Sequence, residues 1–169
     1  MKYNLKEQIY SIREAEKKDQ KAVQRFIELV DNDFYPPLSE RGGGIPERVQ
    51  KCLDTPEANY LIAGLNEVDP SDPLDGMIGC TKNWKSKGSA YVNFLATHPD
   101  YRNLGVSKEL TGKFEEKLKK KEFKKIYLCT WSSNQAAIKF YENLEYKACS
   151  IVLNHRGKDV HTIYYIKKI

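Results

Sequence analysis

The sequence predicts an α/β fold in which helices flank a central mixed, mostly antiparallel sheet. Segments that alternate apolar and polar residues recur along the chain beside segments whose apolar residues fall every three or four positions. Their order is β-α-α-β-β-β-α-β-α-β-β, which combines antiparallel hairpins with a helical crossover. The length of 169 residues suits one hydrophobic core, so we expect a single domain over residues 1–169.

The first quarter of the chain contains one predicted strand and two helices. Residues 8–14 alternate apolar and polar side chains, as a half-buried strand does. Residues 20–30 carry apolar side chains at helical spacing. These side chains are Val23, Phe26, Ile27 and Val30. Residues 31–44 contain two prolines and three consecutive glycines, so we expect a flexible loop without regular structure. Pro46 suits the first turn of a short helix that ends at Leu53.

Three further strands are predicted in the middle of the chain. They cover residues 58–65, 76–84 and 90–97. Residues 66–75 are expected to form a turn, and the polar segment 85–88 is typical of a hairpin connection. The last two of these strands are therefore expected to be antiparallel neighbours.

A crossover helix and a final group of elements complete the pattern. Residues 106–121 are predicted to be helical, with lysines at the end where the helix dipole favours cations. Their apolar residues at every fourth position are Val106, Leu110, Phe114 and Leu118. Residues 126–131 are predicted to form a strand and residues 134–143 a helix. Residues 147–154 are expected to pair with residues 159–167 across a turn.

Composition narrows the classes of function. Lys and Arg number 28 against 23 Asp and Glu, a net charge of +5 that favours anionic ligands. Residues 117–125, with Phe123 among lysines, keep nucleic-acid binding open as an alternative. A solvated helix end accounts for the same lysines, so we expect no nucleic-acid partner.

The four cysteines are widely separated, so no metal site is predicted. No apolar run approaches the roughly 18 residues of a membrane span, and residues 1–8 do not resemble a signal peptide, so we expect a cytoplasmic protein without membrane contact.

One segment has the layout of an anion site. The strand over residues 90–97 runs into a turn and then directly into a helix, whose first backbone N–H groups are unpaired and carry positive potential. Gly105 permits a positive φ or close approach of the backbone, Ser107 is small and adds a donor, and Arg102 adds a full charge. These features favour a pyrophosphate ligand, although a plain connector can show the same pattern.

Two motifs resemble those of a known family, the GNAT N-acetyltransferase superfamily. Residues 95–107 read LATHPDYRNLGVS and resemble its coenzyme A pyrophosphate motif, Arg/Gln-x-x-Gly-x-Gly/Ala after a strand, with Ser107 in place of the usual Gly or Ala. Residues 134–146 read NQAAIKFYENLEY and resemble its helix Asn-x-x-Ala-x-x-Phe/Leu-Tyr-Glu-x-x-Gly-Phe, with Glu145 and Tyr146 in place of the Gly-Phe pair. The two motifs lie in the order that the family has, with a strand between them.

The resemblance implies acetyl-coenzyme A as the donor and a small-molecule or peptide amine as the acceptor. It implies that the backbone of three strand residues pairs with the pantetheine arm of the cofactor. These are Leu95, Ala96 and Thr97. It implies that the turn and the first helical residues bind the pyrophosphate. These are Arg102, Asn103, Leu104, Gly105, Val106, Ser107 and Lys108. In the second motif, Asn134 and Ala137 would contact the cofactor and Tyr141 would lie near the thioester sulfur.

Tyr141 is the candidate catalytic residue. Direct attack of an amine on a thioester expels a thiolate, and a tyrosine can give that sulfur a proton. An ordinary phenol has a pKa near 10 and a thiol one near 8.5, so transfer is easier if the site lowers the pKa of Tyr141.

The general base is harder to predict. Some family members carry a Glu on the strand before the second motif, and here that position is Cys129, while Asn93 cannot accept a proton. Three acidic residues on the acceptor side remain, each also explained as a surface charge. These are Glu28, Asp31 and Asp33. His98 is interpreted as a turn residue.

Three questions stay open at this level. The chain can be a sensor that binds coenzyme A without turnover. The acceptor can be a polyamine, an amino acid, an aminoglycoside or a protein N-terminus, because the expected acceptor side, residues 28–56, has little pattern. An exposed sheet edge near the C-terminal strands could pair two copies in a homodimer.

Overall fold

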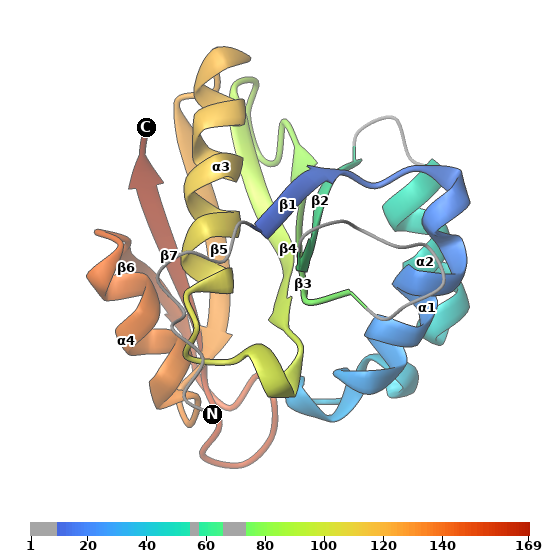
Figure 1. The fold of residues 1–169 in the computed structure, drawn as a ribbon. Coiled ribbons are helices and arrows are strands. Elements are labelled where there is room, and N and C mark those ends of the chain that lie inside the picture. The colour runs from blue at the N-terminus through green and yellow to red at the C-terminus, as the bar shows by residue number, and fades with distance from the viewer. Residues whose placement is uncertain (1–9, 55–57, 66–73) are drawn as a thin grey trace. The chain divides into compact units, whose positions relative to one another are not determined.

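The computed structural model describes residues 10–54, 58–65 and 74–169, and its helices and strands follow the predicted order (Figure 1). The elements are β1 Tyr10–Glu14, α1 Gln20–Leu29, α2 Gly44–Asp54, β2 Ala58–Leu65, β3 Gly76–Lys82, β4 Ser89–Thr97, α3 Val106–Lys120, β5 Lys125–Trp131, α4 Gln135–Asn143, β6 Lys147–Val152 and β7 Thr162–Lys168. The start of the first predicted strand and most of the predicted turn over residues 66–75 lie outside the described residues. Within the described ranges, no helix is long and apolar enough to cross a membrane.

The strands form a seven-stranded mixed sheet with the hydrogen-bonding order β1-β2-β3-β4-β5-β7-β6. The pairs β1–β2, β5–β7 and β6–β7 are antiparallel. The pair β4–β5 is parallel and is joined by the crossover helix α3, as a parallel connection requires. The predicted fold class is therefore confirmed.

The chain divides into two compact units that interleave in sequence. The first contains residues 1–79 and 94–116, and the second contains residues 80–93 and 117–169. The expectation of one domain over the whole chain stays a prediction, and each unit is described by itself.

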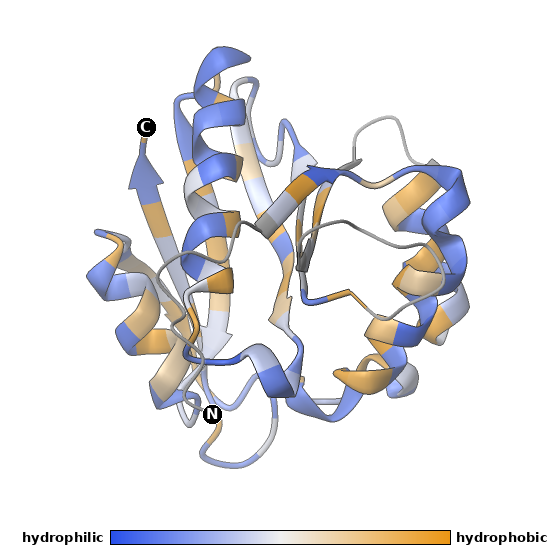
Figure 2. Ribbon diagram, in the orientation of Figure 1, coloured by the Kyte–Doolittle hydropathy of each residue, from blue (hydrophilic) through white to orange (hydrophobic). Residues whose placement is uncertain are grey.

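The core of the first unit includes the apolar face of α1. The four residues predicted to form this face, Val23, Phe26, Ile27 and Val30, are all fully buried. They cluster with apolar residues of α2, β2 and β4, among them Val49, Ile62 and Phe94. Figure 2 shows hydrophobic and hydrophilic residues interspersed along α1 and α2, as expected for helices with one face in a core.

The segment between α1 and α2 differs from the prediction. Residues 31–44 contain two 3-10 turns, Asp31–Asp33 and Leu38–Glu40, and α2 already begins at Gly44. Leu38 is buried in the core, and Phe34 stacks on Phe94 of β4 with ring centroids 5.2 Å apart. The expectation of a loop without regular structure was wrong, because proline and glycine content does not reveal contacts with distant residues.

The second unit contains the C-terminal hairpin. The predicted pairing of its two last strands is confirmed, with β6 and β7 antiparallel and a register shift between Ala148 and Ser150. β6 ends the hydrogen-bonding order, and every residue in it is exposed. The exposed side chains of Ile151, Val152 and Leu153 continue along this edge. The exposed sheet edge expected near the C-terminal strands is therefore present at β6. Pairing of two copies of the chain through this edge stays a prediction.

Candidate active site

The strand-turn-helix of the first motif lies within the first unit. His98 caps a 3-10 turn over Pro99–Tyr101, its ring nitrogen accepting from the N–H of Asp100 at 3.2 Å, which agrees with its interpretation as a turn residue. Asn103 and Gly105 then have φ values of +64° and +91°. Asparagine and glycine are the residues that adopt this left-handed region most easily. They turn the chain sharply into α3, which begins at Val106.

The turn leaves room for a ligand at Gly105. A Cβ atom built on Gly105 would meet no other atom within 4 Å, so the backbone there faces open space. α3 runs for 15 residues from this point, and its first N–H groups face the same end of the helix. The residues present therefore fit a pyrophosphate.

Ser107, the departure from the family motif, has a specific partner. Its hydroxyl lies 2.6 Å from that of Thr97, the last residue of β4, and its carbonyl accepts from Thr111 at 2.7 Å. The serine therefore joins the strand to the first turn of the helix.

A glycine at the start of β3 lets the same helix pack closely. A Cβ atom on Gly76 would lie within 3 Å of side-chain atoms of Val106 and Leu110. Because Gly76 has no side chain, Val106 and Leu110 of α3 can pack directly against the backbone of β3.

Arg102 has a partner that the motif does not reveal. Its guanidinium forms an ion pair with Asp33 of the loop before α2, and its Nε donates to the carbonyl of Thr97 at 3.4 Å. Both charged side chains are more than two-fifths exposed, so the pair is open to solvent. A cofactor phosphate would compete with Asp33 for Arg102.

Three acidic residues considered as general bases each have a structural partner. Asp33 binds Arg102. Asp31 accepts from the backbone N–H of Ser39 at 2.9 Å and from its hydroxyl at 2.6 Å. Burial tends to raise the pKa of Asp31, but these hydrogen bonds outweigh it and hold the pKa below the ordinary value. Glu28 accepts from Gln24 on the exposed side of α1 at 2.9 Å.

The second motif lies in the second unit. Asn134 is the N-cap of α4, and its side-chain oxygen accepts from the N–H of Ala137 at 3.2 Å. The side-chain NH2 of Asn134 would therefore be the group that donates a hydrogen bond to a ligand.

Tyr141 is buried on α4 among aromatic residues. Its ring centroid lies 5.4 Å from that of Phe140, 5.9 Å from that of Tyr146 and 6.2 Å from that of Tyr165. Burial raises the pKa of Tyr141 well above the ordinary value, and the thiol of Cys129 raises it further. The phenol therefore keeps its proton at neutral pH. The pKa of Tyr141 is therefore raised, not lowered as easy proton transfer from this phenol would require.

Cys129 has a polar and aromatic environment that the sequence did not reveal. Its sulfur lies 3.0 Å from the hydroxyl of Tyr91 and 3.5 Å from Nη2 of Arg156. Trp84 stacks on Tyr91 with centroids 4.6 Å apart, and Tyr127 lies beside it. Tyr91 and Asn93 are two residues apart in β4, and Tyr127 and Cys129 are two residues apart in β5. Residues two apart in a strand lie on the same face, so this spacing is the sequence signal for the shared position of the side chains in each pair.

The lysine-rich segment of residues 117–125 does not carry a stacking aromatic. Phe123 is only 9% exposed, so its ring is not available to stack on a base. The residues that the structure describes also hold no cluster of His, Cys, Asp and Glu of the kind that could bind a metal ion.

Comparison with known proteins establishes the class. The model of the Acetyltransferase (GNAT) family matches residues 20–146. This chain therefore belongs to the GNAT acetyltransferase family, and the resemblance of its two motifs is confirmed.

Individual relatives agree with this assignment. A protein named acetyltransferase from Pectobacterium atrosepticum is 38% identical over 104 residues, which are 62% of this chain and 68% of that protein. A putative streptothricin acetyltransferase from Bacillus anthracis, solved in complex with acetyl coenzyme A, is 27% identical with a TM-score of 0.60 over 69% of this chain and 65% of that one. The ribosomal-protein-S18-alanine N-acetyltransferase from Escherichia coli has a TM-score of 0.76 at 19% identity, covers 95% of this chain and 94% of its own, and shows the shared fold.

Proposed function

We propose that this chain transfers an acetyl group from acetyl-coenzyme A to a primary amine by direct attack on the thioester. The observation that carries the proposal is the turn at Gly105, where a positive φ leaves open space in front of the first N–H groups of α3. Membership of the GNAT acetyltransferase family supports the donor.

The proposed cofactor contacts follow the first motif. The parallel ladder between β4 and β5 covers only Ser89–Val92 of β4, so Leu95, Ala96 and Thr97 lie beyond it. We assign their backbone groups to the pantetheine arm. We assign the pyrophosphate to the N–H groups from Asn103 to Lys108, with Arg102 as the cationic side chain and Asn134 as a donor to the arm.

Tyr141 is proposed to hold and donate a proton. Acetyl-coenzyme A, when bound, supplies an acetyl group whose carbonyl carbon an unprotonated amine can attack. Tyr141 is protonated at neutral pH, so its hydroxyl can hydrogen-bond the sulfur and give it a proton as the C–S bond breaks. The raised pKa makes this phenol a weaker acid, so the hydrogen bond to the sulfur is the larger part of its proposed role. The proton that the attacking nitrogen loses on forming the amide restores the phenol through solvent. The ring packing around Tyr141 holds the phenol in one place.

Binding and turnover test the proposal separately. Calorimetry with acetyl-coenzyme A should show binding, and release of free thiol should accelerate when a panel of small amines and peptide N-termini is added. Binding without amine-dependent thiol release would instead identify a protein that binds coenzyme A without catalysis. Absence of binding would remove the cofactor assignment.

Replacing Tyr141 tests the catalytic role. Tyr141→Phe keeps the ring, so affinity for the cofactor should change little while kcat falls by about 10²–10⁴-fold. Tyr146→Phe, which removes a hydroxyl from the neighbouring buried ring, is the matched control and should keep most of its rate. A thioester with a better leaving thiol should partly rescue Tyr141→Phe. Wild-type kcat in Tyr141→Phe would show that another group protonates the sulfur.

A further inference from the structure

Charge is distributed unequally between the two units. The second unit, residues 80–93 and 117–169, contains 15 Lys and Arg against 4 Asp and Glu, a net charge of +11. The first unit contains the remaining 13 Lys and Arg against 19 Asp and Glu, a net charge of −6. The modest excess of +5 over the whole chain is therefore the difference between an acidic unit and a strongly basic one.

Eight exposed lysines of the second unit lie at one end of its strands, which we call the basic end. The connection between β3 and β4, the end of α3, the start of β5 and the end of β7 meet there (Figure 1). The N–H of Lys124 donates to the carbonyl of Gly88 at 2.8 Å, and the N–H of Ile169 donates to the carbonyl of Lys124 at 3.1 Å. The eight residues are Lys85, Lys87, Lys119, Lys120, Lys121, Lys124, Lys125 and Lys168.

The end of α3 also lies close to β3. Burial raises the pKa of the Cys80 thiol of β3 to about 12, and the positive charges of Lys82, Lys117 and Lys121 oppose this shift. Lysines of β3 and of α3 therefore lie near the same buried thiol. The basic end is thus formed by segments that are far apart in the sequence and that the tertiary structure brings together.

The lysines of the basic end have few acidic neighbours. None of the eight forms an ion pair with a residue in the ranges 10–54, 58–65 and 74–169. Lys85 lies 4.4 Å from the ring centroid of Trp84, a contact that leaves its charge in place. Three acidic residues in the second half of α3 and the turn that follows it are outnumbered by the lysines. These are Glu115, Glu116 and Glu122.

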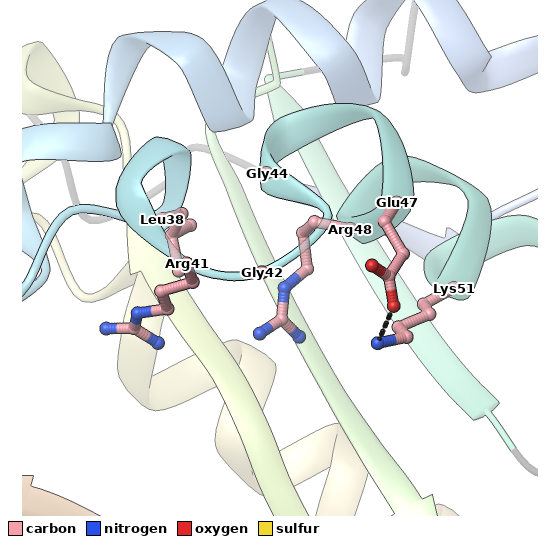
Figure 3. Close-up of a pocket in the computed structure, with 7 residues that line it drawn as sticks. All are labelled: Leu38, Arg41, Gly42, Gly44, Glu47, Arg48 and Lys51. Carbon is pink, nitrogen blue, oxygen red and sulfur yellow. Dashed lines mark ion pairs between the residues drawn. The ribbon is translucent and has the colours of Figure 1, made fainter.

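Cations of the first unit are arranged differently. Arg13 donates to the carboxylate of the buried Asp19 at 2.6 Å and 2.7 Å. Lys51 pairs with Glu47 at a small hollow that is lined by the loop before α2 and by the start of that helix (Figure 3). Opposite charges at such distances cancel much of each other's potential. Among the described residues, no pair of this kind involves the eight lysines.

Two lysines of the basic end directly oppose each other. Lys125 of β5 is the register partner of Lys168 of β7 in the antiparallel ladder. Side chains at such positions project to the same face of the sheet, and like charges there are destabilising. This arrangement costs the free chain stability, and a ligand of opposite charge would relieve the repulsion.

The aromatic side chains near the basic end are engaged within the chain. Phe123 is buried, and Trp84 has Lys85 over its ring and stacks on Tyr91. Proteins that bind single-stranded nucleic acid do so with exposed rings on which the bases stack. The basic end therefore favours a ligand that presents charges rather than bases.

Exposed apolar side chains of the second unit lie at the other end of its strands. Among the described residues of this unit, the exposed large hydrophobic ones are Ile151, Val152 and Leu153. Val152 pairs with Thr162, the first residue of β7, whereas Lys168 is the last. Peripheral membrane proteins combine positive charge with apolar side chains that enter the lipid. At the basic end the charge is not combined with such a patch, which disfavours a membrane partner.

We propose that the basic end binds the phosphate backbone of a double-stranded nucleic acid. Lysine ammonium groups bind phosphate oxygens as point charges and do not require access to bases. A duplex presents closely spaced phosphates, so lysines from several elements can each reach one. The expectation that no nucleic acid binds considered residues 117–125 alone, and it would then be wrong. The structure adds to that segment the lysines of the β3–β4 connection and of β7.

Salt-dependent binding tests the proposal. Fluorescence anisotropy follows the full chain with a 20-base-pair DNA duplex and with an RNA duplex of the same sequence, so the two arms distinguish the sources of the phosphates. About four to six phosphate contacts should make the affinity for at least one duplex fall about 100–2,000-fold between 50 mM and 200 mM salt. No binding of either duplex at 50 mM salt, or a fall of less than about tenfold, would overturn the proposal.

Other anions test the choice of partner. The same assay uses a 20-nucleotide single strand, polyglutamate and vesicles that contain phosphatidylserine, each at equal concentration of negative charge. The duplex should bind at least about tenfold more tightly than each of them, because it combines high charge density with a rigid spacing of phosphates. Equal or tighter binding of the single strand, the acidic polypeptide or the vesicles would overturn the assignment to a duplex.

Variants test whether lysines from different elements act together. Lys87→Gln, Lys124→Gln and Lys168→Gln should each weaken duplex binding about threefold to tenfold and reduce the salt dependence by about one phosphate contact. Lys158→Gln removes the same charge from the loop before β7, at the other end of that strand, and should bind normally. Unchanged affinity in the triple variant, or an equal loss in Lys158→Gln, would overturn the proposal.

Stability separates a binding role from a structural one. Lys168→Glu places opposite charges at the register pair with Lys125, so its thermal midpoint should rise by about 1–3 °C while duplex affinity falls at least about tenfold. A lower thermal midpoint with unchanged affinity would show that Lys168 supports the fold instead, and would overturn its part in the proposed surface.

Discussion

Two irregular segments of the first unit both lead into a helix, yet they are organised in different ways. The turn from Thr97 to Ser107 is held by contacts between residues close in sequence, such as the hydroxyls of Thr97 and Ser107 and the cap that His98 provides. The loop over residues 31–43 has local hydrogen bonds, such as those from Ser39 to Asp31, but it is also held by distant residues, since Phe34 stacks on Phe94 and Asp33 pairs with Arg102.

This difference decides how far each segment can be understood from sequence. Positive φ values at Asn103 and Gly105 are encoded by the residue types themselves. The partners of Phe34 and Asp33 lie 60 or more residues away, and no local rule links them. Locally organised segments produce motifs, whereas tertiary packing organises segments that have none.

The largest expected effect concerns the turn. Gly105→Val places a β-branched residue at a φ of +91°, which costs about 1–3 kcal/mol, and fills the space proposed for pyrophosphate. Affinity for acetyl-coenzyme A, measured by calorimetry, should fall about 100-fold. Gly112→Val, at an exposed helical glycine with open space around it, should bind normally. Unchanged affinity in Gly105→Val would show that the turn does not approach the phosphate.

The next effect concerns the packing of the loop. Phe34→Ala removes a partly buried ring that stacks on Phe94 and contacts the core of the first unit. Loss of a fully buried phenylalanine costs about 3–5 kcal/mol, so we expect about 2 kcal/mol here, measured by urea unfolding. Leu29→Ala, at an exposed apolar residue of α1, should cost much less. Equal stability of the two variants would mean that the loop is not held by the core.

A smaller effect concerns the ion pair that joins the two segments. Asp33→Asn frees Arg102 for the cofactor and removes a negative charge near the turn. Because an exposed pair is worth about 0.2–1 kcal/mol, affinity for acetyl-coenzyme A should rise up to about fivefold at low salt and less at high salt. Glu116→Gln, an equal change of charge on α3, is the control. Weaker binding in Asp33→Asn would show that Asp33 supports the cofactor rather than competing with it.

The smallest effect is a pH dependence within the loop. The pKa of Asp31 is lower in the folded chain than in the unfolded chain, so its hydrogen bonds to Ser39 stabilise the fold above the ordinary aspartate range. This stabilisation is lost as pH falls through the lowered pKa. Asp31→Asn should therefore cost below about 1 kcal/mol at pH 7 and nothing near pH 2. A cost that is the same at both pH values would assign the effect to packing instead of charge.

The sequence by itself determined the order of the elements and the apolar faces of the helices. Val106, Leu110, Phe114 and Leu118 are all buried, as their four-residue spacing predicts. It also determined the two motifs, because the turn at Asn103 and Gly105 needs residue types that adopt a positive φ. Such properties belong to neighbouring residues, and periodicity or a short motif expresses them.

Only the tertiary structure decided the environment of each charged or reactive group. It pairs Arg102 with Asp33, places Arg156 and Tyr91 beside Cys129, and lines one hollow with Arg41 and Arg48. The raised pKa of Tyr141 has the same origin, since burial and Cys129 act on it through space. Electrostatic interactions and desolvation depend on distances in the folded chain, and separation in sequence does not set those distances.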